Sequence, residues 1–207
     1  MKVLELFAGS RSFSKAAEEL GHETFAVDIK DFDNIDYVTD ILDFDVAKVP
    51  FKPDIIWASP PCTYFSVASI GHHWNKDHTP KTKEAIVGCQ IVIKTLEIIN
   101  ELQPDYFFIE NPRGKLRKLD FMKKLPRATV TYCQYGDVRM KPTDIWTNHL
   151  YSPLFSEGWK PRTICKNGDS CHVSAPRGSQ TGTQGLKDNY ERSKVPYELC
   201  KEILLSL

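Results

Sequence analysis

The sequence predicts an α/β fold in which helices flank a parallel sheet. Short apolar runs alternate with amphipathic stretches from the first residues onward, and they have the lengths of strands and helices. Strands separated by helices form βαβ units, which keep successive strands parallel. The chain of 207 residues suits one domain with a small appendage, and its 41% of apolar residues suffices for a packed core.

The expected elements follow from the periodicity. Strands are expected at 2–7, 23–28, 54–59, 105–110, 128–133 and 143–148, and helices at 12–21, 84–102 and 195–207. After residue 148 the chain is rich in Gly, Ser, Thr and Pro without clear periodicity, which indicates a compact irregular insert. We therefore expect a main domain over 1–148, an insert over 149–190, and a segment over 191–207 whose helix returns to the sheet.

The composition gives no sign of a strong overall field. Lys+Arg and Asp+Glu balance at 27 each, although a local basic face would be enough to bind DNA. The N-terminus has no signal-peptide pattern, and no stretch approaches the roughly 18 apolar residues of a membrane span. A soluble cytoplasmic protein is expected. Its six scattered cysteines are expected to be reduced, because they are too sparse for a disulfide scaffold.

Four candidate site residues follow the predicted strands. Right-handed crossovers would bring the ends of strands 2–7, 23–28, 54–59 and 105–110 to one edge of the sheet. Ligands of open α/β sheets bind outside the carboxyl ends of their strands. The residues at these ends are Gly9, Asp28, Cys62 and Glu110.

The turn FAGS (7–10), together with Asp28, suits a cofactor that carries a nucleoside. A turn of small residues lets a ligand approach the backbone, and the helix that follows offers free N–H groups. An acid that ends the second strand can accept hydrogen bonds from a ribose diol. The alternative is an ordinary strand–helix turn, because Arg11 and Ser12 stand where a glycine-rich pattern would continue.

Cys62, in WASPPCTYFS, has two interpretations. A catalytic cysteine must be accessible and must form a thiolate, whereas free cysteines are commonly buried as small apolar residues. Glu110, in IENPRG, could protonate a bound ring or could cap the helix that follows. Because both residues end strands beside the cofactor candidate, catalysis is favoured.

Three further motifs are less specific. Arg139 and Lys141 lie in the loop of YGDVRMKPTDIWTN and could be ordinary surface charges. Cys165, Cys171 and His172 have side chains that suit zinc, and Cys133 or His149 could complete the set, but the spacing does not decide whether a metal binds. A polar loop carries three more histidines, for which loop contacts are expected rather than metal ligation: His72, His73 and His78.

The ordered motifs resemble those of the DNA (cytosine-5) methyltransferases, most closely the short bacteriophage forms. LELFAGSRSFSKAAEELG is similar to the family's first motif, and AVDIK, VTDIL, DIIWASPPCTYFS, FFIENPRG and VPYELCKEIL follow in the family's order. The resemblance covers nearly the whole chain. It implies a Rossmann-like sheet that binds S-adenosylmethionine over 1–148, a target-recognition insert over 149–190, and a C-terminal segment over 191–207 that returns to the catalytic domain.

The resemblance also implies the chemistry. S-adenosylmethionine would methylate C5 of a cytosine flipped out of double-stranded DNA, as in restriction–modification systems. Cys62 would attack C6 with Glu110 at N3, and Arg139 and Lys141 would complete the catalytic set. The loop 63–80 would close over the base. The residues implied in cofactor binding are Phe7, Ala8, Gly9, Ser10, Asp28, Ile29, Asp40, Ile41, Ser59, Pro61 and Val195.

The chain departs from the family pattern at several positions. Arg11 and Ser12 replace glycines, Lys141 and Thr143 stand where two arginines are usual, and 193–194 reads Ser-Lys instead of Asn-Ser. The short insert leaves little chain for reading DNA sequence, so specificity is loose or a partner supplies the rest. Two alternatives stay open, namely RNA cytosine methylation or another one-carbon transfer in the same pocket, and a DNA-binding or host-modulating protein on a decayed scaffold. The sequence does not indicate an oligomeric state. If the protein is encoded by a phage, we expect it in the host cytoplasm.

Overall fold

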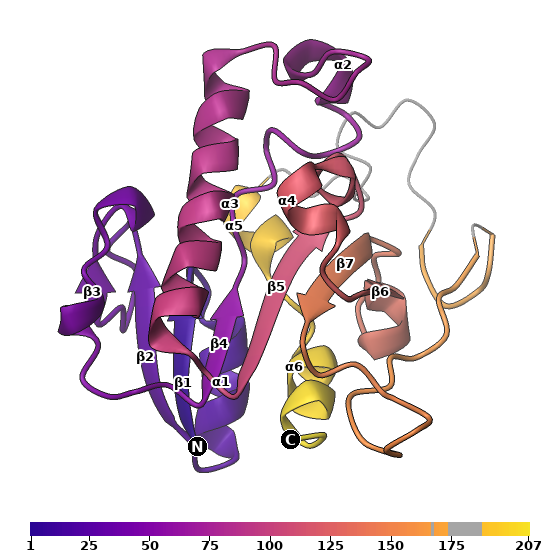
Figure 1. Ribbon diagram of the computed structural model, residues 1–207. Coiled ribbons are helices and arrows are strands. Elements are labelled where there is room, and N and C mark those ends of the chain that lie inside the picture. The colour runs from indigo at the N-terminus through magenta and orange to yellow at the C-terminus, as the bar shows by residue number, and fades with distance from the viewer. Residues whose placement is uncertain (167, 174–187) are drawn as a thin grey trace.

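A computed structural model describes residues 1–166, 168–173 and 188–207, and its central feature is a seven-stranded sheet (Figure 1). The strand order across the sheet is β3-β2-β1-β4-β5-β7-β6. Helices cover both faces, so the predicted α/β class is confirmed. The strands are β1 (Lys2–Leu6), β2 (Glu23–Asp28), β3 (Tyr37–Val38), β4 (Ile55–Ala58), β5 (Tyr106–Pro112), β6 (Arg127–Thr131) and β7 (Pro142–Thr147).

The sheet is mixed, so the prediction of a parallel sheet is wrong at its last strand. Strands β1 to β5 pair in parallel, but β7 lies between β5 and β6 and is antiparallel to both. The connection from β6 to β7 runs over 132–141 and contains a 3₁₀ helix, η4 (Tyr132–Tyr135), rather than a long crossover helix. Antiparallel neighbours can be joined by such a short connection, whereas parallel ones cannot.

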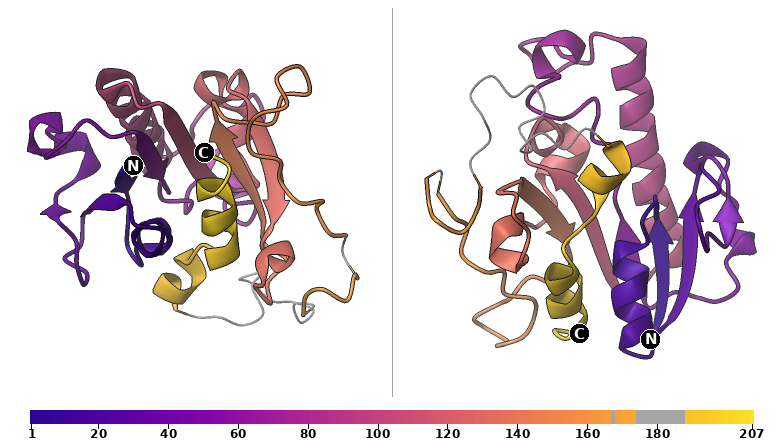
Figure 2. Two further views of the ribbon diagram at one scale, coloured as in Figure 1. Left: turned by 90° about the horizontal axis from the view of Figure 1, so that it is seen from below. Right: turned by 180° about the vertical axis from the view of Figure 1, so that it is seen from behind.

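The two faces of the sheet are covered by different helices. Figure 2 shows α3 (Lys83–Leu102) on one face and the pair α1 (Ser12–Glu19) and α6 (Tyr197–Leu204) on the other. Side chains alternate accordingly along β1, where Leu4 packs in the α3 core and Val3 in the α1–α6 core. The shorter helices are α2 (Ile70–His73), α4 (Asp120–Lys123), α5 (Asn189–Ser193), η1 (Ile41–Asp43), η2 (Val46–Lys48) and η3 (Leu116–Lys118).

A buried carboxylate from β1 caps the first turn of α1. The residue before this helix, Arg11, has a left-handed backbone and makes no side-chain cap. Instead, Glu5 in β1 accepts hydrogen bonds from the backbone N–H groups of Phe13 at 3.2 Å and Ser14 at 2.7 Å. Two N–H groups that the helix leaves unpaired are thereby satisfied. Burial raises the pKa of Glu5, and these hydrogen bonds offset part of that increase.

The start of the insert packs on the sheet rather than standing apart. The backbone of Leu150 pairs with that of Trp159, and the Trp159 side chain is buried in the α1–α6 core. The predicted helix at 195–207 is confirmed, although it begins at Tyr197 after Pro196. The division at 148 and 190 stays a prediction, and the part of the insert over 174–187 lies outside the described residues. Across the described ranges, no helix combines the length and apolarity needed to cross a bilayer.

Candidate active site

The ends of β1, β2, β4 and β5 meet at one edge of the sheet, because these neighbouring strands are parallel. The structure places Gly9, Asp28 and Cys62 at or just after these ends, as the sequence predicts, whereas Glu110 lies within β5, which continues to Pro112 instead of ending at residue 110. Two of these residues are in direct contact, since the N–H of Gly9 donates to Oδ2 of Asp28 at 2.9 Å. The edge of the sheet is therefore the candidate site.

The turn after β1 is built from left-handed backbone. Phe7, Gly9 and Arg11 have φ angles of 59°, 46° and 55°, which only glycine adopts without cost. The Arg11 side chain does not fill the turn, because its guanidinium is paired with Glu18 and lies 3.4 Å from Thr24 Oγ1. The arginine that replaces a family glycine thus contacts the far end of its own helix and the neighbouring strand.

Asp28 is held rigidly by backbone donors. Its Oδ2 accepts from Gly9, and its Oδ1 accepts from the N–H of Lys30 at 2.9 Å. Each carboxylate oxygen has two lone pairs, so both can accept a further hydrogen bond from a diol. Beside it, Ile29 is 62% exposed and offers an apolar surface. The accepting carboxylate and the apolar surface beside it therefore fit the ribose and the base of a nucleoside, respectively.

The remaining residues implied in cofactor binding lie around this turn. Asp40 caps η1 by accepting from the N–H of Leu42 at 3.0 Å, whereas Ile41 is buried in the α3 core. Ser59 accepts from the Trp57 indole at 2.9 Å. The others differ in exposure: Ala8, Ser10 and Val195 are buried, Phe7 is partly buried and Pro61 is exposed.

Cys62 begins a tight turn after the two prolines. Its carbonyl accepts the N–H groups of Phe65 and Ser66, each at 3.0 Å, and its side chain is half-buried. The turn is tied to the next strand, because the Asn111 side chain donates to the Pro60 carbonyl at 2.8 Å. Asn111 directly follows Glu110, so this hydrogen bond fixes the position of the cysteine turn relative to the glutamate.

The surroundings of Cys62 shift the pKa of its thiol in opposite directions. Burial raises the pKa of the Cys62 thiol, the positive charge of Lys141 lowers it, and the charge of Glu110 raises it. The net result is a pKa above that of an ordinary thiol. Among the neighbouring charges, that of Lys141 contributes most to favouring the thiolate.

Glu110 has a partner that sequence reasoning missed. The carboxyl group is only 5% exposed and accepts a hydrogen bond from the Tyr132 hydroxyl at 2.8 Å. Burial raises the pKa of Tyr132 well above its ordinary value, with a further contribution from Glu110, so the hydroxyl stays a donor. The sequence assigned Tyr132 to a strand, where an aromatic residue looks like core, and no motif distinguished it.

Lys141 lies over the same tyrosine. Its Nζ is 4.6 Å from the centre of the Tyr132 ring and donates to the Arg192 carbonyl at 3.2 Å. Thr143, where the family has an arginine, is fully buried and bonds the Lys141 carbonyl at 3.1 Å. Tyr132 therefore links Lys141 and Glu110 on one side of the candidate site.

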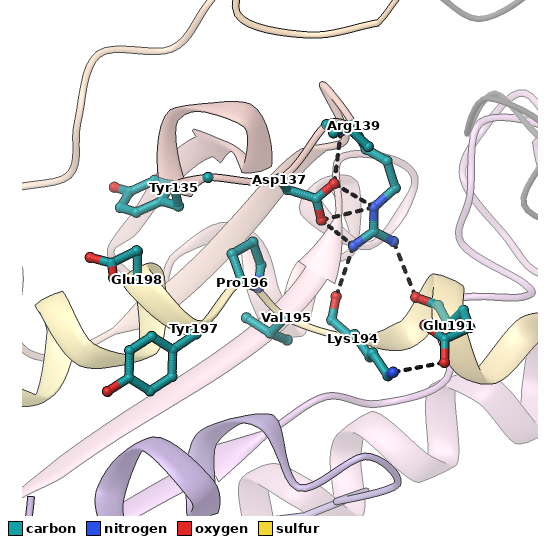
Figure 3. A pocket seen from close by; sticks show the side chains of 11 residues that line it. Tyr135, Asp137, Arg139, Glu191, Lys194, Val195, Pro196, Tyr197 and Glu198 are labelled. Carbon is teal, nitrogen blue, oxygen red and sulfur yellow. Dashed lines mark hydrogen bonds and ion pairs between the residues drawn. The ribbon is translucent and has the colours of Figure 1, made fainter. Parts of the chain in front are cut away.

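The Arg139 side chain binds a neighbouring carboxylate and several backbone carbonyls. Figure 3 shows its ion pair with Asp137 and its hydrogen bonds to the carbonyls of Glu191 at 3.4 Å and Lys194 at 3.2 Å. It also donates to the Arg192 carbonyl at 3.1 Å. It is only 5% exposed. The side chain thus holds the connection between α5 and α6 against the loop that carries Lys141.

The pocket in Figure 3 lies beside the candidate site and has a volume of about 580 Å³. It is formed by the loop 135–139 and by residues 191 and 194–198, and neither Cys62 nor Glu110 lines it. Val195, which lines this pocket, also bonds the start of α1, since its N–H donates to Ser12 Oγ at 3.2 Å. The C-terminal segment therefore returns to the turn after β1.

The histidines of the loop 63–80 make loop contacts. His73 Nδ1 is 2.7 Å from Thr82 Oγ1, and His78 Nδ1 is 2.8 Å from the Lys115 amine. The loop is anchored by Trp74, which is buried and donates to the Tyr64 carbonyl at 2.7 Å. These contacts position the loop next to the cysteine turn.

Comparisons with known proteins agree with the motifs. The family model of the C-5 cytosine-specific DNA methylases matches residues 1–128, more than half of the chain. A protein of Frog virus 3 (isolate Goorha) named "Probable DNA (cytosine-5)-methyltransferase" is 32% identical over 225 residues, which cover 99% of both chains.

Solved structures show the same fold at low identity. One is described as a "putative DNA modification methyltransferase encoded within prophage" from E. coli, with a TM-score of 0.55 and 17% identity over 80% of this chain and 52% of that one. Another is the Entamoeba histolytica methyltransferase EhMeth, with a TM-score of 0.53 and 12% identity over 71% of this chain and 52% of that one. The chain thus spans about half the length of these two solved structures.

The sheet order and these structures together define a Rossmann-like methyltransferase fold. The chain belongs to the C-5 cytosine-specific DNA methylase family, and the predicted enzyme class, DNA (cytosine-5)-methyltransferase, is confirmed. Its relative from Frog virus 3 is matched over 99% of its length, so it is similarly short.

Proposed function

We propose that the protein transfers a methyl group from S-adenosylmethionine to C5 of a cytosine flipped out of double-stranded DNA. The observation that supports this most strongly is the hydrogen bond from Asn111 to Pro60, because it holds the Cys62 turn against the residue next to Glu110. A nucleophile and an acid are thereby supported from adjacent strands.

S-adenosylmethionine would supply an electrophilic methyl group, held by the left-handed turn over 7–11 and by the Asp28 carboxylate. This carboxylate is already oriented by two N–H donors and has lone pairs left for a ribose diol. Ile29 provides an exposed apolar surface beside it. The C-terminal segment, through Val195 and Ser12, closes the other side of the turn.

The protein residues would act on the base in a defined order. The Cys62 thiolate, favoured by Lys141, adds to C6, and Glu110 holds or protonates N3, so electron density builds at C5. Once C5 carries the methyl group, it loses its proton, the bond from C6 to sulfur breaks, and Cys62 leaves. The leaving group of the methyl transfer is S-adenosylhomocysteine, water accepts the C5 proton, N3 returns any proton to Glu110, and the thiolate is regenerated.

The test is methyl transfer from labelled S-adenosylmethionine to DNA, with 5-methylcytosine identified by nucleoside mass spectrometry. Cys62→Ala and Cys62→Ser should abolish transfer while the fold is kept. Cys89→Ser is the matched control, because Cys89 is likewise a half-buried free thiol but lies in α3. Undiminished transfer in both Cys62 variants would contradict the mechanism.

The same assay separates the alternatives. Unmodified DNA together with 5-methylcytosine in RNA would favour the RNA reaction. A protein that binds DNA but not S-adenosylmethionine in calorimetry would favour a decayed scaffold. The retention of both Cys62 and Glu110 supports an active enzyme over the decayed one.

A further inference from the structure

Four metal-binding side chains converge away from the candidate active site. The ligand atoms of Cys133, Cys165, Cys171 and His172 all lie within 4.8 Å of one another. Cys133 lies in η4, immediately after β6, and the other three lie in the insert. The sequence could not choose between Cys133 and His149 as the fourth member. The structure brings Cys133 into the set, while His149 bonds the Ser206 carbonyl at 2.9 Å.

The distances suit tetrahedral coordination. The sulfurs of Cys133 and Cys165 are 3.1 Å apart, and those of Cys133 and Cys171 are 3.6 Å apart. His172 Nδ1 is 3.7 Å from the Cys165 sulfur and 3.5 Å from the Cys171 sulfur. Since Zn–S bonds are about 2.3 Å long, two sulfurs on one tetrahedral zinc are separated by roughly 3.8 Å. For all four to bind one ion, the sulfurs of Cys133 and Cys165 would have to move apart from 3.1 Å, while any pair near the 4.8 Å limit would have to approach.

Hydrogen bonds hold two cysteines of the cluster in place. Thr131 Oγ1 accepts the N–H of Cys165 at 3.0 Å, which fixes the first cysteine of the insert beside β6. The Gln134 amide lies 3.4 Å from the Cys171 sulfur, where it donates to that sulfur. Donors of this kind orient and stabilise metal-bound thiolates.

The cluster connects the irregular insert to the segment 132–141, between β6 and β7. Val173, next to His172, donates its N–H to the Val138 carbonyl at 3.1 Å, in the loop that leads to Arg139. Arg162 donates to the Gln134 carbonyl at 2.7 Å. Figure 1 shows this part of the insert beside β6. An irregular segment with little core of its own gains most from a metal that closes it.

We propose that Cys133, Cys165, Cys171 and His172 bind one structural Zn²⁺, which fastens the insert to the catalytic sheet next to Tyr132. Three sulfurs and one imidazole select zinc over oxygen-preferring cations. All four positions are filled by protein, so the ion is structural and takes no part in methyl transfer. The inference does not depend on the proposed reaction.

The first test is the metal content of the purified full-length protein, measured by plasma mass spectrometry. We expect one zinc per chain, and we expect Co²⁺ to replace it and to give the absorption of thiolate-bound tetrahedral cobalt. A zinc-free protein that also fails to bind Co²⁺ would overturn the proposal. So would an intact mass lower by two hydrogens, if peptide mapping placed the disulfide among these cysteines.

Variants then locate the site. Cys165→Ser and Cys171→Ser should lose the zinc, whereas Cys89→Ser should retain it because Cys89 lies in α3. If Cys165→Ser does not fold, His172→Gln provides a milder change at a partly exposed position, and its zinc should be released faster to a chelator. Zinc retained in both Cys171→Ser and His172→Gln would exclude this ligand set.

Chelation of the wild-type protein separates a structural from an adventitious ion. Removal of zinc should speed proteolytic cleavage within 149–173, and added zinc should restore resistance. Because this readout is proteolysis, it holds whether or not the protein methylates DNA. Unchanged cleavage would show that the ion does not fasten the insert.

Discussion

Tyr132 donates its hydroxyl hydrogen to Glu110 Oε1 at 2.8 Å, inside the sheet and out of contact with solvent. Glu110 lies in β5 and Tyr132 in the 3₁₀ helix after β6, and β7 separates these two strands. The hydrogen bond therefore spans the antiparallel strand and holds one oxygen of the carboxyl group in place. Glu110 is a proposed catalytic residue, and Tyr132 is a positioning residue.

Tyr132→Phe should lower kcat with little change in KM for DNA. A hydrogen bond to a carboxyl group contributes about 1–3 kcal/mol, so the expected loss is roughly 10- to 100-fold. Steady-state methyl transfer measures it. Tyr135→Phe is the matched control, because Tyr135 is also buried in η4 but accepts from the Arg162 N–H instead of contacting Glu110. Equal kcat values in the two variants would refute the positioning role.

The pH dependence follows from the raised pKa of Cys62. The thiolate is the reactive form, and at a pH below the pKa only a small fraction of the thiol is ionised. We therefore expect kcat/KM to rise with pH through the neutral range, by about tenfold per pH unit, and to level off only at alkaline pH. A flat profile in that range would mean that the thiol ionises at much lower pH.

Lys141→Met should move that profile to higher pH. Lys141 is the main group that lowers the Cys62 pKa, so its loss leaves burial and Glu110 to raise the pKa further. Activity at neutral pH should fall and should partly recover as the pH increases. Lys15→Met serves as the control because Lys15 is exposed on α1. A loss of activity that is the same at every pH would assign Lys141 a role other than thiolate stabilisation.

The sequence could predict the positions at strand ends but not the contacts across the sheet. The apolar pattern of a strand is local in sequence. It could therefore place Cys62 and Glu110 near the ends of buried strands. The antiparallel insertion of β7 between β5 and β6 depends on packing between distant segments, which no local pattern records. Tyr132 therefore appeared as a core aromatic, although its hydroxyl contacts Glu110.

The same distinction applies to the cysteine cluster. Cys165, Cys171 and His172 are close in sequence, so their residue types indicated zinc. Cys133 and His149 were equally placed candidates, since the choice depends on how the insert folds back on β6. The hydrogen bond from the Cys165 N–H to Thr131 holds the insert beside β6, so that Cys133 becomes the fourth member. That contact spans 34 positions of the chain.

Asp144→Ala should lower the free energy of unfolding by about 3–5 kcal/mol. Asp144 in β7 is fully buried, is paired with Arg117 and accepts from Thr129 at 2.8 Å, so its removal leaves the arginine without its main partner. Denaturant unfolding measures the loss. Asp120→Ala removes an exposed ion pair to Lys123 and should cost less than about 1 kcal/mol. Equal costs would show that the buried pair contributes no more than a surface one.

Gly114→Ala should disturb the Cys62 turn through a steric clash. A Cβ at Gly114 would lie 2.2 Å from the Phe65 carbonyl oxygen, whose position is also fixed by the Lys115 N–H at 2.7 Å. The clash involves backbone, so the segment that follows Cys62 must move. We expect unfolding to become easier by roughly 1–3 kcal/mol, and the rate of methyl transfer to fall with it.

The control for this change is Gly71→Ala. No atom lies within 4 Å of a Cβ at Gly71, which is in α2, and alanine favours a helix more than glycine does. Its unfolding free energy should match or slightly exceed that of the wild type. If Gly114→Ala unfolds and reacts like Gly71→Ala, the close approach of Gly114 to Phe65 does not constrain the cysteine turn.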